Sequence, residues 1–231
     1  VLGGGQLGRM FAVEAKRLGY HVHVYSPQDD APAAQVADLH TQAAFEDLDA
    51  VANFARGLDV VTLEFENLPL EMTDVANEFA PVRPSGKILH TTQNRLREKR
   101  FLQSIGIPTA PFTAICSLED VAKIEAGALP GVLKTASWGY DGKGQAKVDS
   151  PTELRSAWET MDTDEAVLEG FIDFEAELSI VAARGLDGAV VTYGPIANTH
   201  VNHILDVSVT PAAVPKAVAP EAIEMAHTIV A

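Results

Sequence analysis

A glycine-rich stretch with a lysine on its leading side, GVLKTASWGYDGKGQ at residues 131–145, constrains the fold of this chain more than any other segment. The apolar residues ending in Lys134 predict a short strand, and Gln145–Val148 predicts its partner. Glycine permits close approach of backbone N–H groups to a ligand, and successive N–H groups form a concave site for anions. We therefore predict a hairpin whose tip clamps a triphosphate with backbone amides, Lys134 and Lys143. A long surface hairpin without a ligand is the alternative. A P-loop is excluded, because Lys143 is followed by Gly144 rather than by Ser or Thr.

The first residues predict a strand, a glycine turn and a helix. Gly3–Gly8 reads GGGQLG, which matches G-x-G-x-x-G, and helix-like sequence follows to Leu18 before a second strand at His21–Tyr25. Such a βαβ opening places the glycine turn at a helix N-terminus, which suits a phosphate. A nicotinamide site also requires an acidic residue at the end of the second strand. The first acid after this strand is Asp29, so that interpretation is disfavoured.

Two carboxylates lie at the end of the next predicted strand, Asp59–Glu66. Alternation places Glu64 and Glu66 on one face, near the carboxyl end of the strand, where open α/β sheets bind ligands. Two interpretations stay open. At least one carboxylate contacts a ligand, or one is solvated while the other caps the helix predicted at Pro69–Phe79.

A basic segment, Thr91–Ile105, predicts one helix that bridges two domains, with Thr91 or Thr92 as its N-cap. Such a run of positive charge is ordinarily a solvated face. In an acidic chain it is also a candidate phosphate contact. Its basic residues are Arg95, Arg97, Lys99 and Arg100.

The charge balance excludes some partners. The chain has 231 residues and a formal net charge of −15 at pH 7, so its surface repels nucleic acids and anionic membranes. We find no apolar run long enough for a membrane span and no signal peptide. The one cysteine, Cys116, suits a reducing cytoplasm and is predicted to be a buried structural thiol. The chain starts at Val1 without Met and stops at Ala231 within an apparent helix, so we expect it to be trimmed at both ends.

The later residues predict short strands at Ala166–Glu169, Glu177–Ala183, Ala189–Tyr193 and Ile204–Val209. The first of these strands ends at Glu169, where the backbone can offer hydrogen bonds to the edge of a purine. His200 and His203 are three residues apart, but further ligands at zinc-site spacing are not evident, so we predict no zinc site.

Four motifs together resemble one family. GGGQLGRM at Gly3–Met10, EFENLP at Glu64–Pro69, the helix and turn at Asn94–Pro108, and SWGYDGKGQ at Ser137–Gln145 occur in the same order as in the N5-carboxyaminoimidazole ribonucleotide synthetases of the ATP-grasp superfamily. The resemblance covers essentially the whole chain. It implies an α/β fold in which an N-terminal Rossmann-like (pre-ATP-grasp) parallel sheet is followed by an incomplete α+β ATP-grasp domain. The implied boundaries are 1–92 for the N-terminal domain, 93–170 for the bridging helix and lid subdomain, and 171–231 for the start of the central subdomain.

The resemblance also implies site residues where the motifs match. Glu169 and the residues after it meet the nucleobase, and Glu177 meets the ribose hydroxyls. The implied ATP-binding residues are Arg95, Lys134, Gly139, Tyr140, Asp141, Gly142, Lys143, Gly144, Gln145, Glu169, Gly170, Phe171, Ile172, Glu177 and His200. The implied catalytic residues are Tyr140, Asp141 and Lys143, and the implied acceptor-binding residues are Gly5, Gln6, Leu7 and Glu66.

The activity implied by the resemblance has two stages. ATP phosphorylates bicarbonate to carboxyphosphate, and carboxyphosphate or its CO₂ then carboxylates 5-aminoimidazole ribonucleotide. Mg²⁺ is implied as well, with its protein ligands expected beyond Ala231, so no metal ligand is assigned. The resemblance further implies a cytoplasmic homodimer. Two alternatives stay open: another ATP-grasp ligase, such as formate-using glycinamide ribonucleotide transformylase, and a nucleotide-binding module without catalysis.

Overall fold

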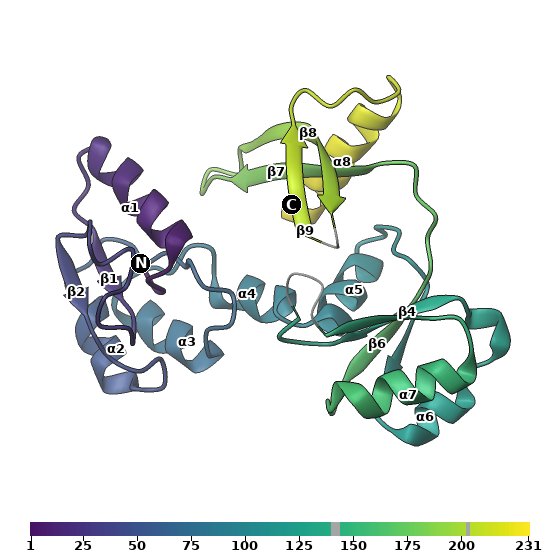
Figure 1. Ribbon diagram of the computed structural model, residues 1–231. Helices are drawn as coiled ribbons and strands as arrows, with labels where there is room; N and C mark the ends of the chain where they lie inside the picture. The colour runs from purple at the N-terminus through teal and green to yellow at the C-terminus, as the bar shows by residue number, and fades with distance from the viewer. Residues whose placement is uncertain (140–143, 202–203) are drawn as a thin grey trace. The chain divides into compact units, whose positions relative to one another are not determined.

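The computed structural model describes residues 1–139, 144–201 and 204–231. These residues form two compact units, Val1–Gln93 and Asn94–Ala231 (Figure 1). Each unit has its own sheet structure and its own hydrophobic core.

A parallel sheet organises the first unit. Strands β1 (His23–Tyr25) and β2 (Leu39–Thr41) pair in parallel, and Leu2 lies between Tyr25 and Leu63 through parallel bridges. The predicted strand Asp59–Glu66 is reduced to such bridges. Its N–H and C=O groups pair with Leu2 on one side and with the Val82 segment on the other, and Glu66 is already exposed. The predicted parallel α/β architecture is confirmed.

Helices cover both faces of this sheet because its strands alternate. Val1 and Val24 pack with the small residues of α1 (Gln6–Arg17), whereas Leu2 and Tyr25 face a second cluster. The second cluster contains residues of α2 (Leu48–Ala55) and α3 (Leu70–Phe79), which lie on the opposite side from α1 in Figure 1. No side chain caps α3, so neither Glu64 nor Glu66 has the capping role considered from the sequence.

Tyr25 is fully buried, and its hydroxyl donates to the carbonyl of Ala44 at 2.6 Å. Burial, with the nearby Asp47 and Glu46 carboxylates, raises the pKa of Tyr25 to about 12, from roughly 10 for a free tyrosine. The folded state therefore holds this proton more tightly than the unfolded state. Stability from this site is present below about pH 10 and is lost as pH rises towards about 12.

Replacing Tyr25 by Phe should consequently flatten the pH dependence of unfolding between about pH 10 and 12. At pH 8 the variant should lose about 0.5–1.5 kcal/mol, because the buried hydrogen bond is gone. Urea unfolding at several pH values measures both effects. Tyr20→Phe, at an exposed tyrosine, is the control. An unchanged alkaline slope in Tyr25→Phe would contradict the assignment.

The helix predicted at Thr91–Ile105 is interrupted near its start, and all four of its basic residues lie in the part that follows the break. Helix α4 (Gly86–Thr92) ends before Asn94, and α5 (Arg95–Ser104) begins after it. Asn94 is the N-cap of α5, since its Oδ1 accepts from the N–H groups of Leu96 and Arg97. The predicted continuous helix with Thr91 or Thr92 as N-cap is therefore wrong: an asparagine cap restarts the helix three residues later.

The second unit contains a four-stranded antiparallel sheet in the order β3-β6-β4-β5. Its strands are β3 (Phe112–Ile115), β4 (Gly131–Thr135), β5 (Gln145–Val148) and β6 (Ala166–Gly170). Helices α6 (Leu118–Lys123) and α7 (Pro151–Met161) contact each other and cover one face (Figure 1). A short 3₁₀ helix (Ala126–Ala128) precedes β4. The predicted β4–β5 hairpin is confirmed.

Cys116 is exposed, so the predicted buried thiol is wrong. Ile115 takes the inward position at the end of β3 and is fully buried. The chain then turns into α6, which leaves the next residue at the surface.

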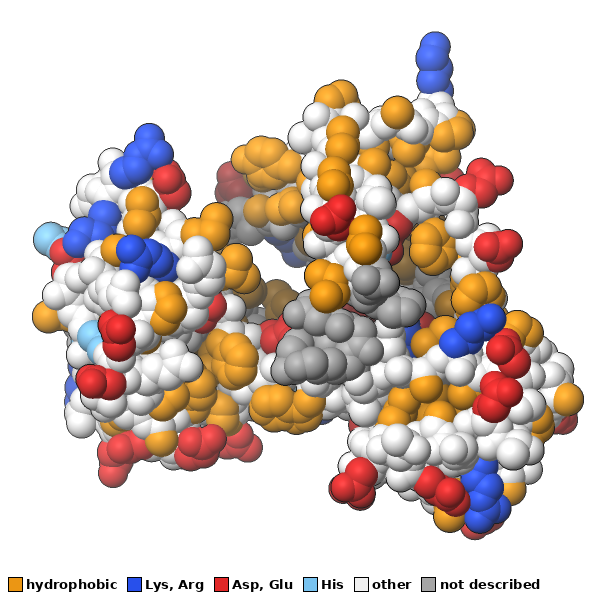
Figure 2. Space-filling view, in the orientation of Figure 1, with side chains coloured by type: hydrophobic (Ala, Val, Ile, Leu, Met, Phe, Trp, Pro, Cys, Tyr) orange, Lys and Arg blue, Asp and Glu red, His pale blue; other side chains and the backbone are white. Residues whose placement is uncertain are grey.

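A three-stranded antiparallel sheet completes the second unit, with β8 (Val190–Val201) between β7 (Glu177–Arg184) and β9 (Ile204–Val209). Helix α8 (Val218–Val230) packs against β7 and β8. β9 is an edge strand, and its described residues are all exposed. Figure 2 shows hydrophobic side chains at the surface over these strands. None of the described helices combines the length and apolar character needed to cross a membrane.

Candidate functional site

Strand alternation on β4 and β6 separates the core from a charged face. Leu133 and Leu168 point into the cluster under α6 and α7. Their neighbours Lys134 and Glu169 lie on the other face, where Val132 pairs with Glu169 and Lys134 pairs with Val167. Lys134 Nζ lies 2.9 Å from Glu169 Oε2. The structure therefore brings together two residues that the sequence placed separately in the ATP site.

A second lysine completes this cluster. Lys99 of α5 places its Nζ 3.1 Å from Glu169 Oε1 and 5.5 Å from the centre of the Phe112 ring. The side chains of Lys99, Glu169 and Lys134 are 14%, 13% and 26% exposed. Burial opposes ionisation of Glu169, but hydrogen bonds and charge from Lys134 and Lys99 outweigh it and hold its pKa below the usual value. From the sequence, Lys99 was one of four basic residues considered as a candidate phosphate contact, and its pairing with Glu169 was not predicted.

Arg95 holds the start of the glycine loop. Its Nη1 donates to the carbonyl of Thr135 at 2.8 Å, and its Nη2 donates to the carbonyl of Gly139 at 3.2 Å. A Cβ at Gly139 would lie 3.0 Å from both guanidinium nitrogens, which is tighter than ordinary packing. Glycine at this position therefore lets the backbone approach Arg95.

The far end of the loop is fixed by β4. The carbonyl of Gly144 accepts from the N–H of Thr135 at 2.8 Å, and Gln145 pairs with Lys134. Gly144 has φ +67°, a conformation that favours glycine. The predicted site residues between these ends lie outside the described residues: Tyr140, Asp141, Gly142 and Lys143.

The first two backbone N–H groups after Glu169 already have hydrogen-bond acceptors within the protein. The N–H of Gly170 donates to Pro111 and the N–H of Phe171 donates to Pro130. The side chains of Phe171 and Ile172 are exposed, and Lys147 Nζ lies 5.0 Å from the centre of the Phe171 ring. The predicted purine contact in this segment thus depends on the carbonyls, on Ile172 and on the apolar surface.

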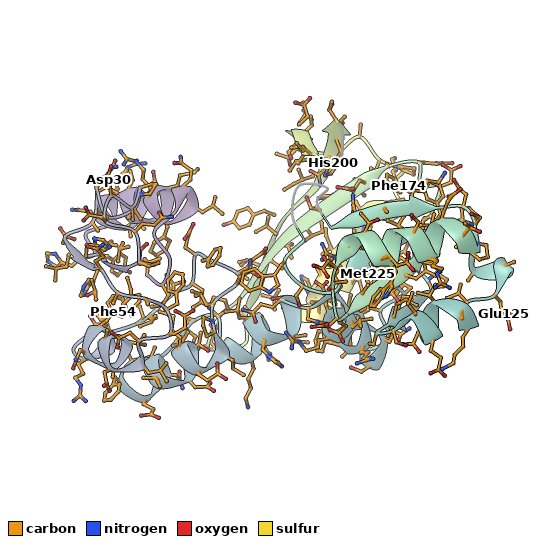
Figure 3. All side chains as sticks on the ribbon, turned by 60° about the horizontal axis from the view of Figure 1, so that its bottom comes forward. Asp30, Phe54, Glu125, Phe174, His200 and Met225 are labelled. Atoms are coloured by element: carbon orange, nitrogen blue, oxygen red, sulfur yellow. The ribbon has the colours of Figure 1, made fainter. Side chains whose placement is uncertain are left out.

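The predicted ribose and histidine residues lie together on β7 and β8. His200 Nδ1 is 3.4 Å from Glu177 Oε1, and His200 is labelled in Figure 3. Asn198 continues the polar row, because its Nδ2 donates to Ser179 Oγ at 2.9 Å and its Oδ1 accepts from Ser208 Oγ at 3.0 Å. The alternation of β7 and β8 could have indicated this row from the sequence.

In the first unit, Glu64 rather than Glu66 lies against the glycine turn. Glu64 Oε2 accepts from the N–H of Gly5 at 3.1 Å, and a Cβ on Gly5 would lie 2.6 Å from Glu64 Oε1. The side chain of Glu66 is exposed, and the described contact of this residue is its carbonyl, which accepts from Gln93. Gln6 and Leu7 lie in the first turn of α1 with exposed side chains. Because a carboxylate already occupies the N-terminus of α1, this turn is poorly suited to a phosphate.

Residues 1–139, 144–201 and 204–231 contain no group of three or more His, Cys, Asp or Glu that could hold a metal ion.

Two family models divide the chain between them. The ribonucleotide synthetase preATP-grasp domain matches residues 1–93, and the ATP-grasp domain matches residues 100–231. Among curated relatives, the bifunctional purine synthesis protein purC/E of Dictyostelium discoideum is 41% identical over 97% of this chain and 23% of its own length. The N5-carboxyaminoimidazole ribonucleotide synthase of Brucella melitensis is 42% identical over 93% of this chain and 60% of its own length.

Solved structures agree with the sequence relatives. An ADP complex of an N5-carboxyaminoimidazole ribonucleotide synthetase has a TM-score of 0.94 and 36% identity, covering 99% of this chain and 61% of that one. The Aspergillus clavatus enzyme in complex with ADP and 5-aminoimidazole ribonucleotide has a TM-score of 0.88 and 29% identity, with the same coverage. The chain thus spans about 60% of the length of the N5-carboxyaminoimidazole ribonucleotide synthases it matches. Since the ATP-grasp model alone matches more than half of its residues, this chain belongs to the ATP-grasp family, and the resemblance found in its motifs is confirmed.

Proposed function

We propose that the protein carrying this chain is an ATP-dependent carbon–nitrogen ligase that carboxylates 5-aminoimidazole ribonucleotide with bicarbonate. The observation that carries the proposal is similarity over both units to N5-carboxyaminoimidazole ribonucleotide synthetases, one of them solved with ADP and 5-aminoimidazole ribonucleotide. Bicarbonate is first phosphorylated by ATP, giving carboxyphosphate and ADP. The amine of the ribonucleotide then takes the carboxyl group from carboxyphosphate, or from CO₂ released by it, and phosphate leaves.

The charged face of β4 and β6 supports binding of the nucleotide phosphates. Lys134, Lys99 and Arg95 gather positive charge in a chain whose net charge is −15. ATP supplies the phosphoryl group, and the task of the protein is positioning and charge stabilisation. Lys134 donates a charge-assisted hydrogen bond to a phosphate oxygen, while Arg95 holds the two carbonyls where the glycine loop begins. Exclusion of water from carboxyphosphate is assigned to that loop.

Mg²⁺ is proposed as the counter-ion of the phosphates, because phosphoryl transfer ordinarily requires it. No described residue is assigned to it. The remaining predicted site residues keep their proposed roles: Tyr140, Asp141 and Lys143 in catalysis, Glu177 at the ribose, and His200 in the ATP site. The three-part division at residues 92 and 170 is likewise a proposal.

A cytoplasmic homodimer is proposed for the whole protein. The single cysteine fits a reducing compartment. Sedimentation of the whole protein measures the oligomeric state, and a monomer at micromolar concentration would contradict the dimer.

For the acceptor, we propose that Glu64 accepts a hydrogen bond from the amine or a hydroxyl of the ribonucleotide. Glu64→Gln is expected to raise the KM for the ribonucleotide about tenfold or more, since a hydrogen bond to a charged group contributes about 1.5–3 kcal/mol. Glutamine retains an oxygen for the N–H of Gly5, so the fold is kept. The KM for ATP should not change.

Glu66→Gln is the matched control for Glu64→Gln and should alter the KM for the ribonucleotide less than about twofold, because its side chain is exposed. Steady-state kinetics with each substrate varied separately gives both values. The reverse pattern, with the larger effect at Glu66, would return the acceptor role to the residue implied by the family resemblance.

ADP release tests the proposed reaction in the protein at the full length of its relatives. Bicarbonate and formate are compared as the one-carbon substrate, each with 5-aminoimidazole ribonucleotide. Release that requires bicarbonate and the ribonucleotide is expected. Release that requires formate would identify a different ATP-grasp ligase. Binding of ATP without ADP release under either condition would identify a nucleotide-binding module.

A further inference from the structure

The carboxylate of Glu169 has a separate lysine on each oxygen. Lys134 of β4 binds Oε2 at 2.9 Å, and Lys99 of α5 binds Oε1 at 3.1 Å. Sequence reasoning assigned Lys134 and Glu169 to the nucleotide, but it named Lys99 only within a basic cluster that was a candidate phosphate contact. Two cations on one largely buried carboxylate leave this cluster with one uncompensated positive charge. A cluster of only Lys134 and Glu169 would be neutral.

Helix geometry fixes Lys99 over this face. Arg95 and Lys99 are four residues apart and therefore lie on one side of α5. Arg95 is tied to the carbonyls of Thr135 and Gly139, and Leu96 is buried in a cluster with Val167 of β6. The helix cannot rotate without breaking these contacts. Lys99 is consequently held against Glu169 by the packing of α5.

The surroundings of Glu169 explain why a second cation, Lys99, affects how Glu169 binds Lys134. Glu169 has Phe112 as its cross-strand neighbour on β3, and the Lys99 ammonium also lies over that ring. Glu98 precedes Lys99 in α5, and burial raises its pKa although the charges of Lys99 and Arg95 lower it. If Lys134 were its only cationic partner, Glu169 could bind the Lys134 ammonium with both carboxylate oxygens. It would then compete with any other anion for that ammonium.

From this arrangement we propose that Lys99 is a positioning residue of the nucleotide site. By occupying Oε1 of Glu169, it limits Glu169 to one hydrogen bond with Lys134. The remaining N–H groups of Lys134 are then free for an anionic phosphate. The assignment rests on the proposed binding of a nucleoside triphosphate at this face, and it gives Lys99 no contact with the ligand itself.

The test is a double-mutant cycle on ATP affinity, measured by calorimetry. Lys99→Met keeps the apolar length of the side chain but removes the charge, and is expected to weaken ATP binding about tenfold. In the Glu169→Gln background the same substitution should change ATP affinity less than about twofold, because the competing carboxylate is gone. Lys99→Arg should remain within about threefold of the unsubstituted chain, since it restores a cation for Oε1.

Two further measurements separate positioning from a general structural role. Affinity for adenosine, measured by competition, should change less than about twofold in Lys99→Met, because adenosine has no phosphate for Lys134. Arg100→Met, at the exposed neighbouring position, is the matched control and should leave ATP affinity unchanged. Circular dichroism confirms that each variant is folded.

Equal losses of ATP affinity in both backgrounds would overturn the proposal and make Lys99 a direct phosphate contact. Equal losses for ATP and adenosine would make its role structural. An unchanged affinity in folded Lys99→Met would remove any role. Failure of the unsubstituted protein, at the full length of its relatives, to bind ATP would instead overturn the proposed nucleotide site, and with it this assignment.

Discussion

Replacing Asn94 by alanine is expected to lower the free energy of unfolding of the Asn94–Ala231 unit by about 2–4 kcal/mol. The Oδ1 of Asn94 accepts from the N–H groups of Leu96 and Arg97, both at 3.0 Å. Its Nδ2 donates to Glu165 Oε2 at 2.7 Å and to Ser137 Oγ at 3.2 Å. Because Asn94 is only 5% exposed, water cannot readily replace these bonds, so each lost partner adds to the cost.

Tryptophan fluorescence in a urea titration measures this loss for the second unit alone, since both tryptophans of the chain, Trp138 and Trp158, lie within it. Ser150→Ala is the control. Ser150 caps α7 by accepting from the N–H of Glu153, and its loss should cost only about 1 kcal/mol. Equal losses in the two variants would show that the Nδ2 bonds of Asn94 add nothing.

Lys134→Ala is expected to weaken ATP binding by about 10- to 150-fold, the effect of losing one charge-assisted hydrogen bond of about 1.5–3 kcal/mol. Lys134 lies at the end of β4 with its Nζ on Glu169. The fold should survive the substitution, because Glu169 retains Lys99 as a partner. Arginine at this position should restore the affinity only in part, since its planar guanidinium has a different reach.

Calorimetry with ATP measures the effect of Lys134→Ala. Lys123→Ala is the control, because Lys123 is an exposed lysine of α6 that pairs with Glu119 at 2.8 Å. Its removal should leave ATP affinity unchanged. A folded Lys134→Ala chain with the original affinity would exclude Lys134 from the nucleotide site.

Local patterns predicted the parts of the fold that depend on neighbours in sequence. The β4–β5 hairpin follows from two short strands flanking a glycine-rich loop. The turn at Gly3–Gly8 correctly placed α1 between two parallel strands. In each case the signal lies within about twenty residues, where propensity and capping act directly.

Competing local signals account for the errors. Thr91, Thr92 and Asn94 are all acceptable N-caps, and the sequence could not show that burial of Asn94 would select it. β8 was predicted to end at Tyr193, before Gly194 and Pro195. The strand instead continues to Val201. A shift of the β7–β8 register between Ser179 and Val181 accommodates Gly194 and Pro195 within the strand.

The candidate site depends on pairs that are distant in sequence. Lys99 and Glu169 meet only because α5 and β6 pack against the same face. Glu64 and Glu66 have the same predicted strand face, and the choice between them depends on where the chain leaves the sheet relative to the turn at Gly5. The motif resemblance implied Glu66, whereas the hydrogen bond from Gly5 to Glu64 is the reason for proposing Glu64 instead.

The exposed edge strand β9 has a practical consequence for work with this chain. Ile204, Leu205, Val207 and Val209 are 46–53% exposed on a strand that pairs only with β8 in the described part of the chain. An open apolar edge of this kind is a template to which a strand of another molecule can add. The only charged residue on the strand is Asp206, so little charge opposes such pairing. If the chain aggregates on concentration, charged substitutions on β9 are the first ones to test.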